Sequence, residues 1–201
     1  MTAPVGALCL QGGAEFGDGC RDMDAAVLEV APPGPVAVVP LAPAPGFERR
    51  TTGEHATSYY RSLTDREIVV TEDADTVRAA ALVVLPGGSP SRLLNALQVN
   101  GIDAALRDVL ARGGAVSGAS AGAMVLGPLT VLPERGRARV VAGLDLSPYC
   151  VVPHWTGDSR WVDALRGQSP EVAVLGLPEQ TSVLVTADGE RELGAGTVAR
   201  L

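Results

Sequence analysis

The chain contains no lysine: its 16 basic residues are all arginines, they face 23 acidic residues, and the formal net charge is −7. A domain that binds nucleic acid usually carries a basic face, so this charge argues against a nucleic-acid partner. No run of about 18 apolar residues is present, and we therefore expect no span across a membrane. Aromatic residues make up only 3% of the chain, so the core must be built from valine, leucine and alanine.

Cysteine and histidine are also scarce, with three and two residues. The cysteines Cys9, Cys20 and Cys150 are odd in number and fit no zinc-binding spacing. We therefore expect them to be reduced core residues of a cytosolic protein. No N-terminal segment pairs a basic start with an apolar stretch of signal-peptide length, which also favours a cytoplasmic location.

What the sequence does contain is an alternation of short apolar runs and helical segments. A chain of 201 residues that is 46% apolar suits one α/β domain, or at most two small ones, and we expect a single domain over residues 1–201. The expected strands are 6–10, 36–41, 67–70, 81–85, 115–117, 172–175, 182–186 and 197–201, and the expected helices are 22–30, 51–63, 73–80, 89–97 and 102–110.

This alternation predicts an α/β three-layer sandwich, in which a mainly parallel sheet has helices on both faces. The last three expected strands are separated by turns rather than by helices. They therefore predict an antiparallel C-terminal edge.

One hydroxyl stands among residues with almost no side chain in the segment 118–122, GASAG, which fits the pattern G-x-S-x-G. A nucleophilic serine must stand clear on a strained turn between a strand and a helix, and glycines two positions to either side remove collisions there. Ser120 is thus the candidate nucleophile, and the N–H of Ala121 at the start of the next helix is a candidate oxyanion donor. The alternative is a Gly/Ala-rich segment that only packs a helix close to a sheet.

A serine hydrolase needs a base, and histidine is the commonest. His154 follows the apolar run 150–153, and the ends of strands are where parallel α/β sheets gather catalytic residues. His55 lies on a polar helical segment, so His154 is the candidate base. The alternative for either histidine is an incidental surface or core position.

The segment 85–90, LPGGSP, ends another buried strand, and its paired glycines let the backbone approach a substrate closely. The N–H of Gly88 is therefore the candidate for the second oxyanion donor. The alternative is a plain turn before a helix, with Ser89 as its cap or Pro90 as its first residue.

Glu179 lies between two expected strands and is the candidate acid that orients His154. Asp145, Asp158 and Asp163 are rivals for this role, and a solvated turn residue is the plain alternative. The chain order Ser, His, Glu differs from the Ser, acid, His order of the α/β-hydrolases. This order, and the 34 residues between serine and histidine, argue against an ordinary esterase fold.

Taken together, these motifs resemble peptidase family S51, which contains aspartyl dipeptidase (peptidase E) and cyanophycinase. The nucleophile segment 118–123 is the most specific part of the likeness. The segments 10–15 (LQGGAE), 85–88 (LPGG) followed by 92–94 (RLL), 154–155 (HW) and 176–181 (GLPEQT) are similar to further segments of the family. The family is related in fold to the class I glutamine amidotransferases, and the resemblance covers most of the chain.

The resemblance implies a triad of Ser120, His154 and Glu179, an oxyanion hole from Gly88 and Ala121, and neither a metal nor an organic cofactor. It also makes four residues candidates for substrate binding: Glu15, Ser89, Trp155 and Arg160. Glu15 has the alternative of capping a turn, and Trp155 that of closing the core beside His154. Asp158 stands where cyanophycinase would have a basic residue, so the sequence does not fix an acidic substrate.

We therefore expect a serine-type peptidase that cleaves a peptide or isopeptide bond of small peptides, as an exopeptidase or dipeptidase. The resemblance implies that this bond lies next to an aspartyl residue. The alternative is a catalytically inactive amidotransferase-like domain that binds or senses a ligand. Release of ammonia, as in the amidotransferases, ranks lower because the nucleophile is serine and not cysteine. The sequence does not determine the oligomeric state, and a homodimer is one of the possibilities.

Overall fold

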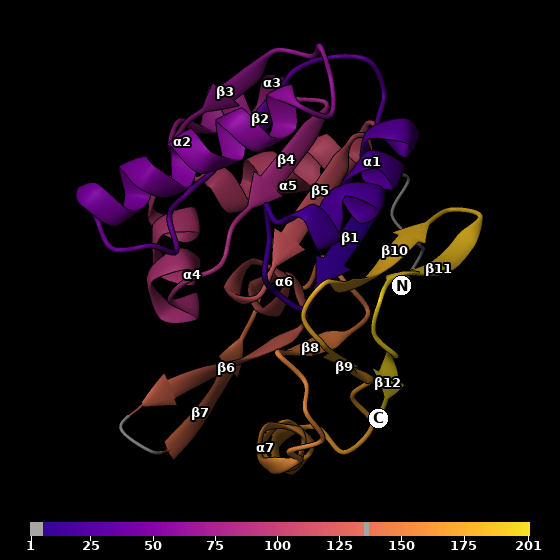
Figure 1. The fold of residues 1–201 in the computed structure, drawn as a ribbon. Coiled ribbons are helices and arrows are strands. Elements are labelled where there is room, and N and C mark those ends of the chain that lie inside the picture. The colour runs from indigo at the N-terminus through magenta and orange to yellow at the C-terminus, as the bar shows by residue number, and fades with distance from the viewer. Residues whose placement is uncertain (1–5, 135–136) are drawn as a thin grey trace.

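The computed structural model describes residues 6–134 and 137–201, and a seven-stranded sheet forms its centre (Figure 1). In sheet order the strands are β11 (Gly189–Gly194), β10 (Thr181–Thr186), β1 (Ala7–Gln11), β5 (Ala115–Ala119), β4 (Leu82–Leu85), β2 (Val36–Val38) and β3 (Ile68–Val70). Strands β1 to β5 pair in parallel, whereas β10 is antiparallel to β1 and to β11. The mainly parallel sheet with an antiparallel edge is confirmed.

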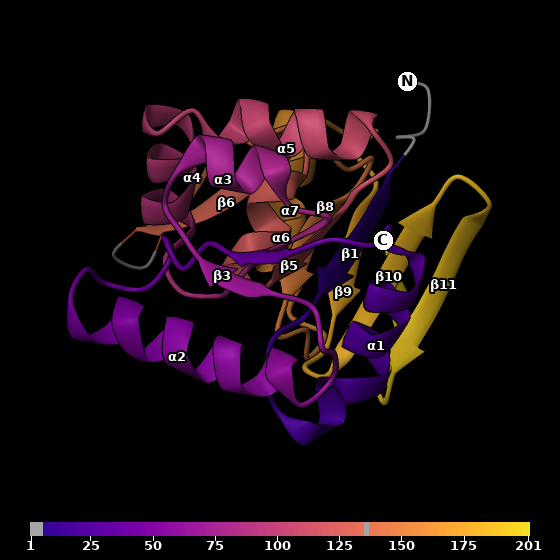
Figure 2. The same ribbon diagram turned by 90° about the horizontal axis from the view of Figure 1, so that it is seen from above.

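Helices cover both faces of this sheet, as Figure 2 shows from above. One layer holds α3 (Ala74–Ala79), α4 (Pro90–Val99), α5 (Ile102–Ala111) and α6 (Ala121–Leu126), and the other holds α1 (Arg21–Val30), preceded by the short helix η1 (Asp18–Cys20), and α2 (Phe47–Arg61). Side chains alternate between the faces of a strand. In β1, Leu8 and Leu10 join one core cluster, while Ala7 and Cys9 join the other.

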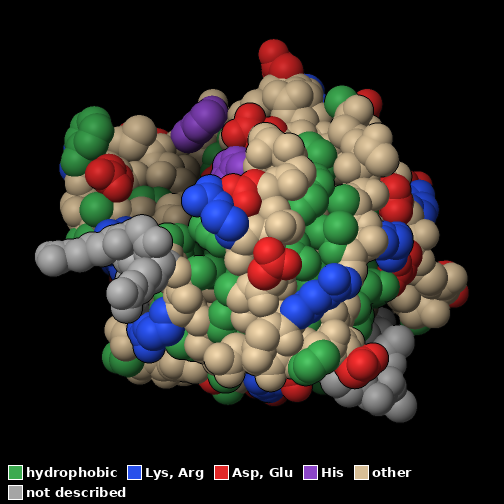
Figure 3. All heavy atoms as spheres, turned by 90° about the horizontal axis from the view of Figure 1, so that it is seen from below, with side chains coloured by type: hydrophobic (Ala, Val, Ile, Leu, Met, Phe, Trp, Pro, Cys, Tyr) green, Lys and Arg blue, Asp and Glu red, His purple; other side chains and the backbone are tan. Residues whose placement is uncertain are grey.

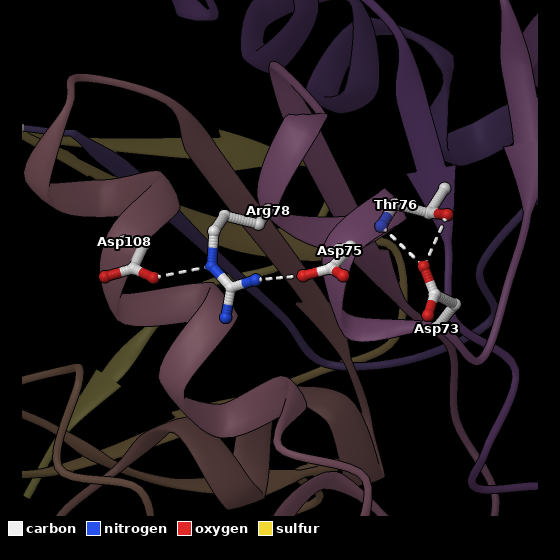
Figure 4. Close-up of polar contacts among 5 residues, drawn as sticks. All are labelled: Asp73, Asp75, Thr76, Arg78 and Asp108. Atoms are coloured by element: carbon white, nitrogen blue, oxygen red, sulfur yellow. Dashed lines mark hydrogen bonds and ion pairs between the residues drawn. The ribbon is translucent and has the colours of Figure 1, made fainter.

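Helix α3 shows how local sequence fixes an element in place (Figure 4). Its cap Asp73 accepts hydrogen bonds from the N–H and the hydroxyl of Thr76, both at 2.8 Å, and these bonds lower the pKa of the Asp73 carboxyl. Arg78 binds Asp75 on its own helix and reaches Asp108 of α5, with Nε 2.8 Å from Oδ2. Helix α3 thus begins at an acidic cap, and the ion pair joins two neighbouring helices.

A smaller layer of structure lies below the sheet in Figure 1. It consists of the hairpin of β6 (Leu129–Glu134) and β7 (Arg137–Ala142), helix α7 (Arg160–Gln168), and a three-stranded sheet of β12 (Ala199–Arg200), β9 (Val174–Leu177) and β8 (Cys150–Pro153). Residues of this layer, Val131, Val152, Val162 and Val174 among them, form a separate core cluster. The end of β8 and the segment after β9 supply two of the candidate site residues.

Several sequence-based expectations about these elements are wrong. Residues 174–177 and 199–200 pair with each other and with β8, not with the antiparallel edge, which is built from β10 and β11. The hairpin and α7 are not predicted at all, because the hairpin strands include Pro133 and α7 buries little more than Val162 and Leu165. Helix α2 begins at Phe47, four residues before the expected start.

All three cysteines are buried and free, as expected, and burial raises the pKa of the Cys9 thiol to about 12.

Within the described residues, no helix is both long and apolar enough to cross a membrane.

Asp24 is a charged residue in the middle of the core, with 1% of its surface exposed. Its carboxylate accepts hydrogen bonds from Gln11 Nε2 at 2.7 Å, from the Tyr59 hydroxyl at 2.8 Å and from the Tyr60 hydroxyl at 3.3 Å. Burial raises the pKa of Asp24, and the three donors offset only part of this rise. The group therefore ties β1, α1 and α2 together at an electrostatic cost.

This cost predicts how stability depends on pH. In the unfolded chain an Asp has a pKa of about 3.9. Between that value and the raised folded pKa, the folded protein holds a proton that the unfolded chain has lost, so this group stabilises the fold less as pH rises, by at most about 1.4 kcal/mol per pH unit. The free energy of unfolding of the parent minus that of Asp24→Asn should therefore decrease as pH rises, measured by urea denaturation from acid to neutral pH. The control is Asp22→Asn on the exposed side of the same helix, and a difference that does not change with pH contradicts the prediction.

Candidate active site

Ser120 occupies the single-residue junction between β5 and α6. Its φ of 50° and ψ of −112° lie outside the regions that residues with a side chain favour, and such a conformation costs about 1–3 kcal/mol. The N–H of Ser120 donates to the carbonyl of Gln11 at 3.0 Å, which anchors the junction to β1. The strained elbow predicted from the sequence is confirmed.

The two flanking glycines make this elbow sterically possible. A Cβ on Gly118 would lie 2.5 Å from the backbone carbon of Gly122, and a Cβ on Gly122 would lie 2.0 Å from the carbonyl oxygen of Leu85 in β4. Side chains at these two positions would push α6 away from β5 and β4. The predicted steric role of the glycines is confirmed.

The candidate nucleophile, base and acid form one chain of hydrogen bonds. Ser120 Oγ lies 2.9 Å from His154 Nε2, and His154 Nδ1 lies 2.9 Å from Glu179 Oε1. The side chains of His154 and Glu179 are 50% and 60% exposed, so water reaches the acid end of the chain. With Nδ1–H donating to the carboxylate, Nε2 is left to accept the serine proton.

The sheet topology explains why residues distant in sequence meet here. Ser120 follows the carboxyl end of the parallel strand β5, and Glu179 precedes β10, which is antiparallel to β1. The start of β10 therefore lies at the same edge of the sheet as the end of β1. His154 follows β8 in the lower layer, and Figure 3 shows histidine side chains with charged neighbours at the rim of a hollow on the face seen from below.

Sequence reasoning missed the part that Gly12 and Gly13 play in placing the histidine. The N–H of His154 donates to the carbonyl of Gly12 at 2.9 Å, and a Cβ on Gly13 would lie 2.4 Å from Cε1 of the His154 ring. Gly13 also has a φ of 127°, a conformation that favours glycine. The imidazole thus packs against backbone that carries no side chain. The paired glycines after β1 are the feature of the sequence from which this contact could have been predicted.

The loop after β4 lies directly beside the nucleophile. A Cβ on Gly87 would be 3.2 Å from Ser120 Cβ, and the N–H of Gly87 donates to Glu15 Oε1 at 2.7 Å. The N–H groups of Gly88 and Ala121 have no hydrogen-bond acceptor among the described residues. These are the two amides predicted to bind an oxyanion.

The substrate-binding candidates lie around this centre with partners of their own. Glu15 binds the Gly87 loop, as above, and the hydroxyl of Ser89 caps α4 by accepting from the N–H of Arg92 at 3.3 Å. Trp155 is partly buried against Gly176, where an added Cβ would lie 2.5 Å from its ring. Arg160 donates from Nε to both carboxylate oxygens of Asp158, at 2.8 and 3.0 Å. Their roles toward a substrate stay predictions.

Three of the rivals for base and acid contact other groups than the candidate triad. His55 is exposed on α2 and packs edge-on against Phe16, with ring centroids 5.7 Å apart. Asp158 is held by Arg160, which lowers the pKa of its carboxyl, and Asp163 accepts from the Ser159 hydroxyl at 3.1 Å. In the part of the chain that the structure describes, Glu179 is the acid in contact with His154.

Two cavities flank the hydrogen-bonded chain. One, of about 250 Å³, is lined by the segment from Val152 to Thr156 and by Asp158, Arg160 and Trp161. The other, of about 410 Å³, lies between Gly87–Gly88 and the N-terminal half of α2 and includes Glu15 and His55. Residues 6–134 and 137–201 contain no group of three or more His, Cys, Asp or Glu side chains placed to hold a metal ion.

Comparison with known proteins gives a family and a fold. The model of peptidase family S51 matches residues 61–193, about two thirds of the chain. A peptidase from an acI-B1 Actinobacterium is 18% identical with a TM-score of 0.76, over 100% of this chain and 99% of that one. A protein from Listeria monocytogenes EGD-e, proposed to be a peptidase E, is 15% identical with a TM-score of 0.69, over 95% and 99%. No curated protein sequence gives a significant match.

Proposed function

The chain belongs to peptidase family S51, and from this premise we propose that it is a serine-type peptidase that forms an acyl-enzyme on Ser120. The observation that carries the proposal is the continuous chain of hydrogen bonds from Ser120 through His154 to Glu179, with 2.9 Å at each link. Such a chain activates a hydroxyl that is otherwise a weak nucleophile.

In the proposed mechanism, Ser120 Oγ attacks the carbonyl carbon of the scissile bond while His154 Nε2 takes its proton. Glu179 holds the imidazole in the tautomer that can accept this proton and offsets the positive charge that develops on the ring. His154 then gives the proton to the leaving amine. Water, deprotonated by the same histidine, attacks the acyl-enzyme and releases Ser120.

The negative charge on the tetrahedral intermediate needs donors in fixed positions. We assign this role to the N–H groups of Gly88 and Ala121, which flank the nucleophile and have no other acceptor among the described residues. The Gly87–Gly88 loop lies against Ser120, and the Ala121 amide belongs to the residue after it. The residue after the nucleophile and a second loop are the usual sources of the two donors in such hydrolases, which supports the assignment.

Small peptides are the substrates we propose, with cleavage as an exopeptidase or dipeptidase at a peptide or isopeptide bond. The exposure of the triad and the two modest cavities beside it favour a short substrate. A preference for Asp next to the scissile bond has weaker support. A substrate carboxylate would have to compete with Asp158 for the guanidinium of Arg160, because a single carboxylate already occupies Nε and Nη2.

A fluorophosphonate probe and a panel of peptides test this proposal together. We expect the probe to modify Ser120 of the folded protein, as identified by peptide mass mapping, and not the Ser120→Ala variant. The panel contains dipeptides and tripeptides with and without an N-terminal Asp, together with β-aspartyl dipeptides. Folded protein that is inert both to the probe and to every peptide indicates the alternative, a domain that binds or senses a ligand without catalysis.

A further inference from the structure

The carboxylate of Glu15 spans the distance between the segment after β1 and the loop after β4. Its Oε1 accepts from the N–H of Gly87 at 2.7 Å, a bond between residues 72 positions apart in the chain. A Cβ on Gly87 would lie 2.8 Å from Glu15 Oε1 and 3.2 Å from Ser120 Cβ, so a side chain at this position would press on both groups. Gly87 is therefore hydrogen-bonded to the Glu15 carboxylate on one side and lies next to the side chain of the nucleophile on the other.

The backbone that carries Glu15 is strained on both sides of it. Ala14 has a φ of 57° and Phe16 a φ of 63°, values that residues with a side chain rarely adopt. The Phe16 ring is buried against Tyr59 and Tyr60 of α2, with centroids 5.6 and 6.2 Å away. Surrounding structure must enforce such a conformation, and here it holds the Glu15 side chain toward the loop.

We propose that Glu15 is a positioning residue that fixes the Gly87–Gly88 peptide so that the Gly88 N–H faces the developing oxyanion; this rests on the proposed function. Two consecutive glycines leave a loop many backbone conformations. A hydrogen bond to a carboxylate is stronger than one between neutral groups, and it uses the Gly87 amide. The Gly88 amide then stays without an internal acceptor and in a set orientation.

What the proposal requires of Glu15 is an acceptor at the right reach, not a negative charge. A carboxylate close to an oxyanion opposes the charge that develops there, so its charge by itself does not help the reaction. The competing role would be recognition of a substrate ammonium group in the cavity of about 410 Å³ that Glu15 also lines. That role requires the charge and would act on substrate binding.

Three substitutions separate these roles, with kcat and KM measured on the peptide that the full-length parent hydrolyses best. Glu15→Gln keeps an acceptor without charge, and we expect kcat within about 3-fold of the parent. Glu15→Asp keeps the charge but draws it back by one methylene, and we expect kcat to fall about 10-fold. Glu15→Ala removes the acceptor, and we expect kcat to fall about 100-fold, the scale of a misplaced catalytic group. KM should change by less than about 3-fold in all three.

The control is Asp73→Ala, which also removes a carboxylate bound to a backbone N–H, but at the start of α3. We expect it to leave kcat unchanged, and thermal melts show that each variant is folded. A peptide aldehyde matching the substrate gives a second readout. Its affinity should fall with kcat/KM across the Glu15 series, while the affinity of the carboxylic acid product stays constant.

Each other outcome overturns the inference. If Glu15→Gln raises KM while Glu15→Asp does not, Glu15 binds a cationic group of the substrate. If the parent is active and Glu15→Ala has the same kcat, the loop does not depend on Glu15, and the proposed function is untouched. If the alanine variant does not fold, the kcat of Glu15→Asp decides the same question. A parent that neither hydrolyses peptides nor is labelled at Ser120 ends the proposed function and this inference together.

Discussion

Replacing Ser120 by alanine is expected to lower kcat/KM for peptide hydrolysis by about 10⁵-fold, because the acyl-enzyme can no longer form. The residues next to Ser120 in the chain cannot replace its oxygen. The neighbouring positions 118, 119, 121 and 122 are glycines and alanines, and none offers a nucleophile to His154. The remaining rate should come from water attacking a substrate polarised by the Gly88 and Ala121 amides.

The measurement is steady-state hydrolysis of the preferred peptide, with protein purified free of the parent enzyme. Residues of a triad act as a unit, so Ser120→Ala and His154→Ala should each cost about as much as the double variant. Ser58→Ala, an exposed serine on α2, is the matched control and should keep full activity. Undiminished hydrolysis by Ser120→Ala would exclude the proposed nucleophile.

The fold can be predicted from the sequence because the patterns that indicate it are local. Val83 and Leu85 face one core cluster and Leu82 and Val84 the other, so β4 is apolar along its whole length, as a strand covered on both sides must be. The elbow at Ser120 can be predicted for a similar reason. The glycines at positions 118 and 122 are needed for contacts within a few residues or with the adjacent strand.

Other features depend on how distant segments are joined. Spacing alone could not choose Glu179 over Asp145, Asp158 or Asp163. The choice depends on β10 running antiparallel to β1, which brings the start of β10 to the edge where β5 ends. The bond between Glu15 and Gly87 has the same origin, since it joins the ends of two strands that are not themselves paired.

Replacing Glu179 by alanine is the second large effect we expect, a fall in kcat of about 10³-fold. Without the carboxylate at 2.9 Å from Nδ1, the imidazole loses both its fixed tautomer and the charge that stabilises the imidazolium. The expected loss is smaller than for Ser120 and smaller than for a buried triad acid. Glu179 is 60% exposed, so water can partly solvate and orient the ring in its place.

The loss should appear in kcat and not in KM, because the carboxylate acts on charge that develops after the substrate has bound. Asp145→Asn and Asp163→Asn are the matched controls, since each removes one of the rival carboxylates, and both should stay within about 3-fold of the parent. If one of them instead abolishes turnover while Glu179→Ala retains it, another acid orients His154 during catalysis. A loop would then have to move, because neither of these carboxylates is bonded to the histidine ring in this structure.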